Sequence, residues 1–196
     1  MKITSFLLFL LLPALFLKCE DDDWSSKPPI EQLPPITQTG EDTFGCLING
    51  EAMYTSGYKS DESAEYVENQ GLIIYGSTDK KGIDTGISII LLEPFTVGQV
   101  YNFTNHPQTT VRFIRSIKEQ STCYYDFGQA ISGSVTISKL DFPNRIVAGT
   151  FDFTIVNETC DTIKVTNGRF DIELSHTVHI PQPQPPAPQP PQPTPN

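Results

Sequence analysis

Few residues in this sequence have the type and spacing that catalytic or metal chemistry needs. The histidines are His106, His176 and His179, and the spacing of the last pair puts their rings on opposite faces of an extended chain. No metal site is therefore expected. The chain also lacks the Gly-Xaa-Ser-Xaa-Gly, Walker and His-Glu-Xaa-Xaa-His signatures of serine hydrolases, phosphoryl-transfer enzymes and zinc hydrolases. We expect neither catalytic residues of these classes nor a bound cofactor.

Carboxylates on strands are the remaining candidates for chemistry, because two of them can cleave a glycosidic bond. The candidates are Asp141, Asp152, Asp171 and Glu173. The last three alternate with apolar residues, so the simpler prediction is that they are solvated charges on the outward face of amphipathic strands. Arg169 stands two positions before Asp171 on the same face, which predicts an exposed ion pair worth at most about 1 kcal/mol.

The N-terminal residues predict an export signal that ends at a cysteine. After Lys2 an apolar run extends from Phe6 to Leu17. This is shorter than the about 20 residues that span a bilayer, and it is typical of a signal-peptide core. Cys19 follows it in the arrangement of a bacterial lipoprotein signal peptide over residues 1–18, in which diacylglycerol alkylates the thiol and anchors the protein in the membrane. Lys18 replaces the small residue that usually precedes the cysteine, and an ordinary secretory signal is the alternative.

An acidic run, Glu20 to Asp23, follows the cysteine directly. It resembles the signal that sends lipoproteins of the Bacteroidota to the outer face of the outer membrane. We therefore expect a lipid-anchored protein at the cell surface, with the periplasmic face or a plain solvated spacer as alternatives. The net charge of the chain is −10, and loss of the leader with its lysines makes it more acidic. That balance excludes nucleic acids and anionic lipid head groups as partners, because both require clusters of Lys and Arg.

Composition divides the exported chain into a central domain and two extensions. Residues 19–42 are rich in Pro and acidic or hydroxyl side chains, show no apolar periodicity, and are predicted to form an extended tether. Residues 179–196 alternate Pro with Gln and are predicted to be a disordered tail. A hydrophobic fraction of 38%, with 12 Phe and 7 Tyr, supplies the core of one domain over residues 43–178.

Alternation of apolar and polar residues predicts strands throughout this domain. Phe151, Phe153 and Ile155 point to one side of a strand, and residues 170–174 repeat the pattern. The sequence therefore predicts an all-β fold, either an antiparallel β-sandwich or a partly closed β-barrel of about nine or ten short strands.

Turn signals and apolar runs refine this picture. Residues 71–75 and 87–92 are near-continuous apolar runs, which predicts central strands covered on both faces. Asn49-Gly50 predicts a tight hairpin. Asn167-Gly168 predicts another turn, just before the last strand, and the acidic stretch 61–68 is predicted to be a solvated loop.

Three cysteines remain after the anchor, which is an odd number for an oxidising compartment. Cys46 lies in an apolar strand and is predicted to be a buried thiol. Cys123 and Cys160 flank polar, turn-rich stretches and are the favoured disulfide, with other pairings left open. In the chain-entropy model a bridge closing that loop adds about 3–4 kcal/mol.

Three segments carry a family resemblance: Thr43 to Gly50, Gly149 to Phe153, and Thr166 to Asp171. Together they resemble a family of uncharacterised lipoproteins of the Bacteroidota, over most of residues 33–174. The resemblance implies a shared fold and export route, and it supplies no catalytic residues. The Pro-Gln tail is not part of the pattern.

These observations favour a lipid-anchored envelope lipoprotein whose β-domain serves for binding or envelope interaction. A glycan or an envelope protein is the expected partner. One rival is a hydrolytic or glycan-processing accessory protein that uses strand-borne carboxylates. Another is an assembly factor that pairs with a second protein through an edge strand.

Overall fold

The computed structural model describes residues 27–178, apart from 56–60, 81, 105–106, 119–121 and 128. The predicted signal peptide, Cys19, the acidic run after it, His106 and the tail at 179–196 lie outside the described residues. In the described part the chain forms a short 3-10 helix and strands. These elements are η2 (Pro29–Gln32), β1 (Thr43–Ile48), β2 (Glu51–Tyr54), β3 (Glu62–Val67), β4 (Gly71–Lys80), β5 (Ile83–Leu92), β6 (Val100–Asn102), β7 (Thr109–Ile117), β8 (Thr122–Tyr125), β9 (Ala130–Asp141), β10 (Ile146–Asn157) and β11 (Cys160–Val178).

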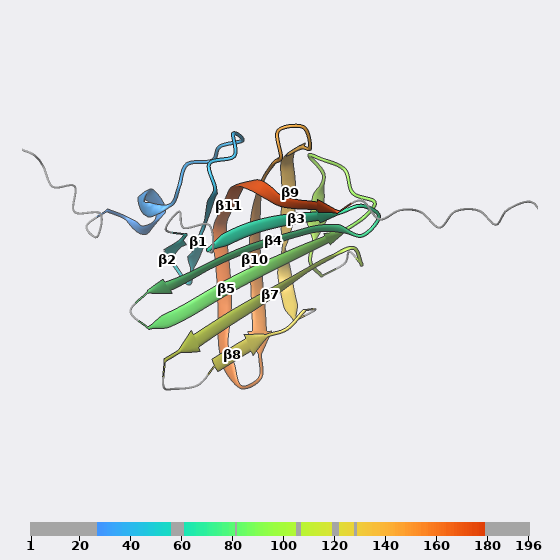
Figure 1. Ribbon diagram of the computed structural model, residues 1–196. Coiled ribbons are helices and arrows are strands. Elements are labelled where there is room, and N and C mark those ends of the chain that lie inside the picture. Colours follow the sequence, from blue (N-terminus) through green and yellow to red (C-terminus); the bar gives the residue numbers. More distant parts are fainter. Residues whose placement is uncertain are drawn as a thin grey trace, which may run out of the picture.

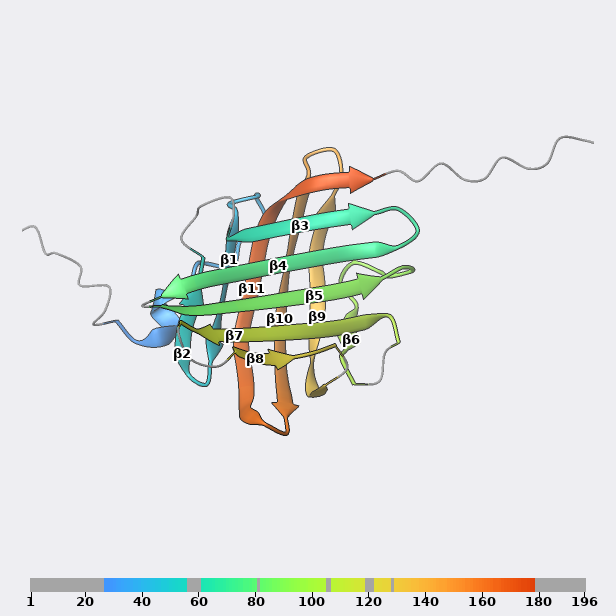
Figure 2. The same cartoon turned by 60° about the horizontal axis from the view of Figure 1, so that its bottom comes forward.

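The strands form one continuous 11-stranded sheet that curls back on itself. One half, here called layer A, contains β6, β9, β10, the first part of β11, β1 and β2. The other half, layer B, contains the end of β11 followed by β3, β4, β5, β7 and β8. The strands of layer A run across those of layer B (Figures 1 and 2). The predicted all-β fold is confirmed as an open half-barrel, although β9, β10 and β11 are longer than expected.

Strand β11 belongs to both layers. Its residues from Cys160 to Glu173 pair with β10, and within that stretch β1 pairs on the other side. From Leu174 onward the same strand pairs with β3 in the parallel direction, after a register shift between Leu174 and His176. The turn from one layer into the other therefore occurs within a single strand (Figure 1).

The core fills the space between the layers. Phe44, Phe113 and Phe153 are at most 1% exposed, and the rings of Phe44 and Phe151 lie 5.2 Å apart, centroid to centroid. The alternation predicted around Phe151 and Phe153 is confirmed, since Asp152 between them is exposed. Each large side chain buried in this way contributes about 1.5–3 kcal/mol, so these contacts hold the two layers together.

Strands β4 and β5 are covered on one face only, which corrects the prediction that both of their faces are buried. Leu72, Ile74 and Ile89 face the core and are fully buried. Ile73 and Leu92 face outward and are 40% and 44% exposed. The prediction was wrong because the outward positions Ile73, Ile90 and Leu92 also carry aliphatic residues, which makes the two runs look apolar on both faces.

The acidic stretch 61–68 is also not a loop. Residues Glu62–Val67 form β3, which lies between β4 and the end of β11. Glu62, Ala64 and Tyr66 face inward and are buried. Inward and outward residues do alternate in this stretch, but one inward position carries a glutamate instead of an apolar residue, so the strand pattern was not recognised. The hairpin at Asn49-Gly50 is as predicted, with positive φ at both residues.

Residues 27–42 do not extend freely from the domain, although the sequence analysis placed them in the tether. This stretch, called the N-terminal segment below, lies against layer A. Leu33 is 6% exposed. Lys139 donates to the carbonyl of Gln38 at 3.0 Å, and the backbone N–H of Glu173 donates to Asp42 at 2.9 Å. Its Pro-rich composition predicted an extended chain but gave no sign that its polar groups find partners on the sheet.

Cys123 and Cys160 form a disulfide in the structure, with Cα atoms 6.1 Å apart. Cys123 lies on β8, the edge strand of layer B, and Cys160 begins β11. The Asn157 amide also donates to the carbonyl of Tyr124 at 2.8 Å. The bridge therefore ties the free edge of layer B to layer A. Cys46 is a buried free thiol, and burial raises its pKa to about 12.

Candidate functional site

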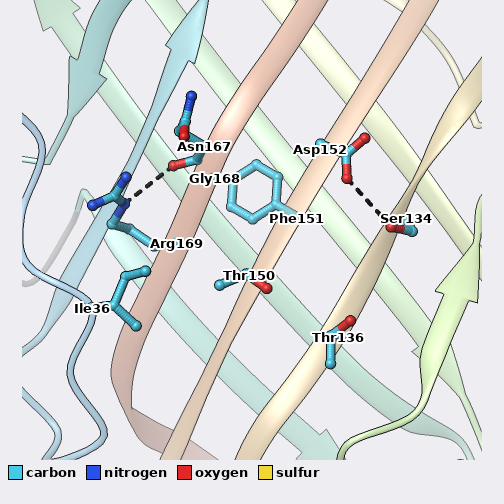
Figure 3. A pocket seen from close by; sticks show the side chains of 9 residues that line it. All are labelled: Ile36, Ser134, Thr136, Thr150, Phe151, Asp152, Asn167, Gly168 and Arg169. Carbon is cyan, nitrogen blue, oxygen red and sulfur yellow. Dashed lines mark hydrogen bonds between the residues drawn. The ribbon is translucent and has the colours of Figure 1, made fainter. Parts of the chain in front are cut away.

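A shallow polar groove lies on the outward face of β9, β10 and β11, bounded on one side by the N-terminal segment (Figure 3). We call it the outer groove. Its volume is about 280 Å³. The residues that line it are Ile36, Ser134, Thr136, Thr150, Phe151, Asp152, Asn167, Gly168 and Arg169.

Strand register places the polar residues of the outer groove in rows. Thr150 of β10 lies between Thr136 of β9 and Arg169 of β11. In the next row Asp152 lies opposite Ser134, and the Ser134 hydroxyl donates to its carboxylate at 3.3 Å. Because alternate residues on a strand share a face, all of these side chains point away from the core.

A bulge in β11 shapes one end of the outer groove. The register between β10 and β11 shifts between Phe151 and Phe153, and Asn167 has a φ of 54° at this point. The turn predicted at Asn167-Gly168 is therefore wrong, because β11 continues and only bulges. Asparagine tolerates positive φ, which explains why the dipeptide carried a turn signal. A Cβ on Gly168 would lie 2.6 Å from the Phe151 ring, which fills that space.

Arg169 links the groove to the N-terminal segment. Its Nε donates to the carbonyl of Asn167 at 3.1 Å, and its Nη1 donates to the carbonyl of Pro34 at 3.2 Å. Burial lowers the pKa of the guanidinium. The ion pair predicted between Arg169 and Asp171 is not formed, because each side chain instead bonds to backbone groups. Ile36, two residues after Pro34, forms the apolar wall of the groove and is 63% exposed.

Asp171 is buried, which corrects the prediction of a solvated charge. It is 1% exposed, and its carboxylate accepts the backbone N–H groups of Thr39 at 2.8 Å and Gly40 at 2.9 Å. Burial raises the pKa of Asp171, but the backbone N–H groups of Thr39 and Gly40 that donate to its carboxylate are among the donors that outweigh this effect, so the pKa is lowered from its ordinary value. The strand position is outward as predicted, and the N-terminal segment covers it.

The four candidate carboxylates do not meet in one site. Asp141 contacts Asn144 in the turn after β9, and hydrogen bonds from Asn144 lower its pKa. Asp152 lines the outer groove, and Asp171 lies under the N-terminal segment. Glu173 forms an ion pair with Arg145 at 3.4 Å in a separate hollow.

That separate hollow, here called the corner hollow, has a volume of about 270 Å³ and also contains Asp42 and Glu62. Glu62 is 5% exposed, and both of its carboxylate oxygens are covered from solvent. Burial raises the pKa of Glu62, the Thr55 hydroxyl lowers it, and the charges of Asp61 and Asp42 raise it further. The net result is a raised pKa, opposite in direction to that of Asp171.

Sequence reasoning missed most residues of the outer groove. Ser134, Thr136 and Thr150 belong to alternating strands and carried no motif. Their side chains meet because β9, β10 and β11 align in one register, which a single sequence does not reveal. Ile36 was missed because its segment was assigned to a tether.

Within residues 27–178, without the gaps given above, no group of three His, Cys, Asp or Glu side chains is arranged to hold a metal ion. No helix within these residues has the length and apolar character that a membrane crossing requires.

A family model described as a domain of unknown function, DUF6252, matches residues 48–171. No curated protein and no solved structure matches the chain. The resemblance to an uncharacterised domain family is thereby confirmed at the level of the domain. The match ends at Asp171, the residue that holds the N-terminal segment.

Substitution of Asp171 by Asn should destabilise the folded domain by about 1–3 kcal/mol at neutral pH, since hydrogen bonds to a charged acceptor contribute about that much. The lowered pKa gives the pH dependence. The stabilisation of the folded domain by the Asp171 carboxylate is complete above the unfolded-state pKa of about 3.9. It is lost as the pH falls through the folded-state pKa. Urea unfolding at a series of pH values measures the difference between the wild type and D171N.

Asp152→Asn is the matched control, because Asp152 is an exposed acid on the adjacent strand. D152N should differ little from the wild type at every pH. Equal stabilities of D171N and the wild type at neutral pH would show that the N-terminal segment does not depend on this carboxylate.

Proposed function

We propose that this chain, which belongs to the DUF6252 family of domains of unknown function, is a lipid-anchored glycan-binding protein of the cell envelope that binds through its outer groove. The observation that carries the proposal is the set of unused polar groups in that groove. In the part of the chain that the structure describes, the hydroxyls of Thr136 and Thr150 and the side-chain amide of Asn167 make no hydrogen bond to the protein. They are available to a ligand.

The chemistry of these groups matches carbohydrate. Each sugar hydroxyl both donates and accepts hydrogen bonds, and so do a threonine hydroxyl and an asparagine amide. Asp152 adds a charged acceptor, and the exposed side chain of Ile36 can contact the C–H groups of a sugar ring. The groove is shallow and lies on an outward sheet face, so a glycan longer than the groove can extend past either end.

Binding is favoured over cleavage because Asp152 is the one carboxylate among the residues that line the groove. Glycoside hydrolysis ordinarily needs two carboxyl groups about 5–9.5 Å apart. The alternative, a glycan-processing protein, would have to use the corner hollow. There Glu62 has the raised pKa of a general acid, but its carboxylate oxygens are covered from solvent. We therefore propose glycan binding as the function and keep glycan cleavage as the alternative.

The anchoring part of the proposal depends on Cys19 and the acidic run behind it. Lys27, the first described residue, stands eight positions after Cys19. Eight residues extend over about 30 Å at most, so a lipid on Cys19 would hold the domain near the bilayer. We propose the outer membrane of a member of the Bacteroidota as the site and the cell surface as the orientation, with the periplasmic face as the alternative.

Glycan binding is tested with the exported chain from Glu20 to Asn196, which retains every described residue. A glycan array should identify a ligand, and Thr150→Val should weaken its binding about three- to tenfold, the effect of one lost hydrogen bond. Thr154→Val is the matched control, because Thr154 lies on the same strand but outside the groove. An array without any bound glycan, or equal losses in T150V and T154V, contradicts the proposal.

Lipid anchoring is tested in the native host. Wild-type protein should partition with membranes and incorporate labelled palmitate, whereas Cys19→Ser should be released and unlabelled, because the thiol is the acylated atom. Proteinase treatment of intact cells reports orientation, and replacing the four acids after Cys19 by their amides should protect the domain from cleavage. Membrane partitioning of C19S at the wild-type level would place the anchor elsewhere.

A further inference from the structure

A second cavity opens on the inner side of the curled sheet, between residues of layer A and residues of layer B. We call it the inner cleft, and its volume is about 300 Å³. One wall is the β1–β2 hairpin, and the other is the inner face of β4, β5 and β7 near the β4–β5 turn. Figure 2 shows that this hairpin and this turn lie at the same end of the sheet. Its floor is apolar, since Ile48, Met53 and Phe113 are at most 9% exposed.

Two cations occupy inward positions at this cleft. On β7 the inward series Val111 and Phe113 continues with Arg115, and on β4 the inward series ends at Lys80. An inward strand position ordinarily carries an apolar residue, because a charge that faces the interior loses hydration. The lining of the cleft therefore combines an apolar floor with a cationic rim.

Arg115 makes neither an ion pair nor a side-chain hydrogen bond with any residue that the structure describes. Its neighbour on the same strand, Arg112, faces outward and pairs with Asp126 at 3.3 Å. The contrast indicates that the charge of Arg115 is available for a ligand.

The surroundings of Arg115 give the orientation of such a ligand. Lys80 is held with its Nζ 3.8 Å from the centroid of the Tyr54 ring, so it stays on the rim between the two hairpins. Arg115 also borders a second hollow of about 530 Å³ beside the disulfide, and that hollow contains the acidic residues Glu158 and Asp161. An anionic group would therefore sit on the Lys80 side of Arg115. The acidic lining residue on that side is Glu51, which is exposed.

We propose that the inner cleft binds a small aliphatic carboxylate, with the carboxylate on Arg115 and Lys80 and the hydrocarbon against the partly exposed Ala52 and Ile83, above the buried Ile48, Met53 and Phe113. Guanidinium binds carboxylate with two parallel hydrogen bonds, which favours this anion over a neutral head group. The volume lies at the lower end of ligand sites, which run from about 300 to 1,000 Å³, so a chain of medium length fits better than a membrane lipid. This site is separate from the outer groove and does not depend on glycan binding.

Calorimetry with the exported chain from Glu20 to Asn196 tests the inference. Octanoate is the probe, and octanol is the neutral comparison of equal chain length. Octanoate should bind and octanol should bind at least about tenfold more weakly, because the head group carries the charged contact. Equal affinities, or no binding of octanoate, would overturn the inference.

Substitutions then locate the site. Arg115→Gln should weaken octanoate binding about tenfold or more, whereas Arg112→Gln, the outward arginine on the same strand, should leave it unchanged. Lys80→Gln changes an exposed side chain and should give a smaller loss. It keeps the test informative if R115Q fails to fold, as judged by circular dichroism. Wild-type affinity in folded R115Q, or in K80Q where R115Q is unfolded, would contradict the proposed site.

Discussion

The structure depends on one strand that belongs to both layers of the sheet. β11 pairs with β10 and β1 along most of its length and then with β3, so the layers join where its register shifts. Its inward residues Phe170, Ile172 and Leu174 are buried in the core between the layers. Its outward residues Arg169 and Asp171 hold the N-terminal segment. The outer groove and the corner hollow both lie along this strand.

Two buried carboxylates, Asp171 and Glu62, have pKa values shifted in opposite directions by their surroundings. Asp171 accepts backbone N–H groups from the N-terminal segment, and these donors overcome the cost of burial and lower its pKa. Glu62 lies close to other acids, and burial raises its pKa. A buried carboxylate surrounded by donors stabilises the folded state at neutral pH, whereas one whose pKa is raised by burial and by neighbouring acids opposes it. Asp171 anchors the N-terminal segment, and Glu62 lies in the corner hollow.

The sequence indicated the elements that depend on local pattern. Alternation around Phe151 and Phe153 predicted the core strands, and Asn49-Gly50 predicted a hairpin, because both signals act over a few residues. The sequence did not predict features that depend on contacts between residues far apart in the chain. The bulge at Asn167 looks like a turn unless β10 and β1 are known to pair on either side of it. The burial of Asp171 depends on Thr39 and Gly40, more than a hundred positions away in the chain, and the row from Thr136 to Arg169 depends on register alone.

The central claim is that the N-terminal segment is part of the folded domain and forms one wall of the outer groove. Amide hydrogen exchange of Thr39 and Gly40, followed by NMR, tests it most directly, because both N–H groups donate to the Asp171 carboxylate. Exchange as slow as that of the amides in the β1–β11 ladder is the result expected from this account. Exchange of both amides at the rate of an unstructured peptide, while the ladder stays protected, would contradict it.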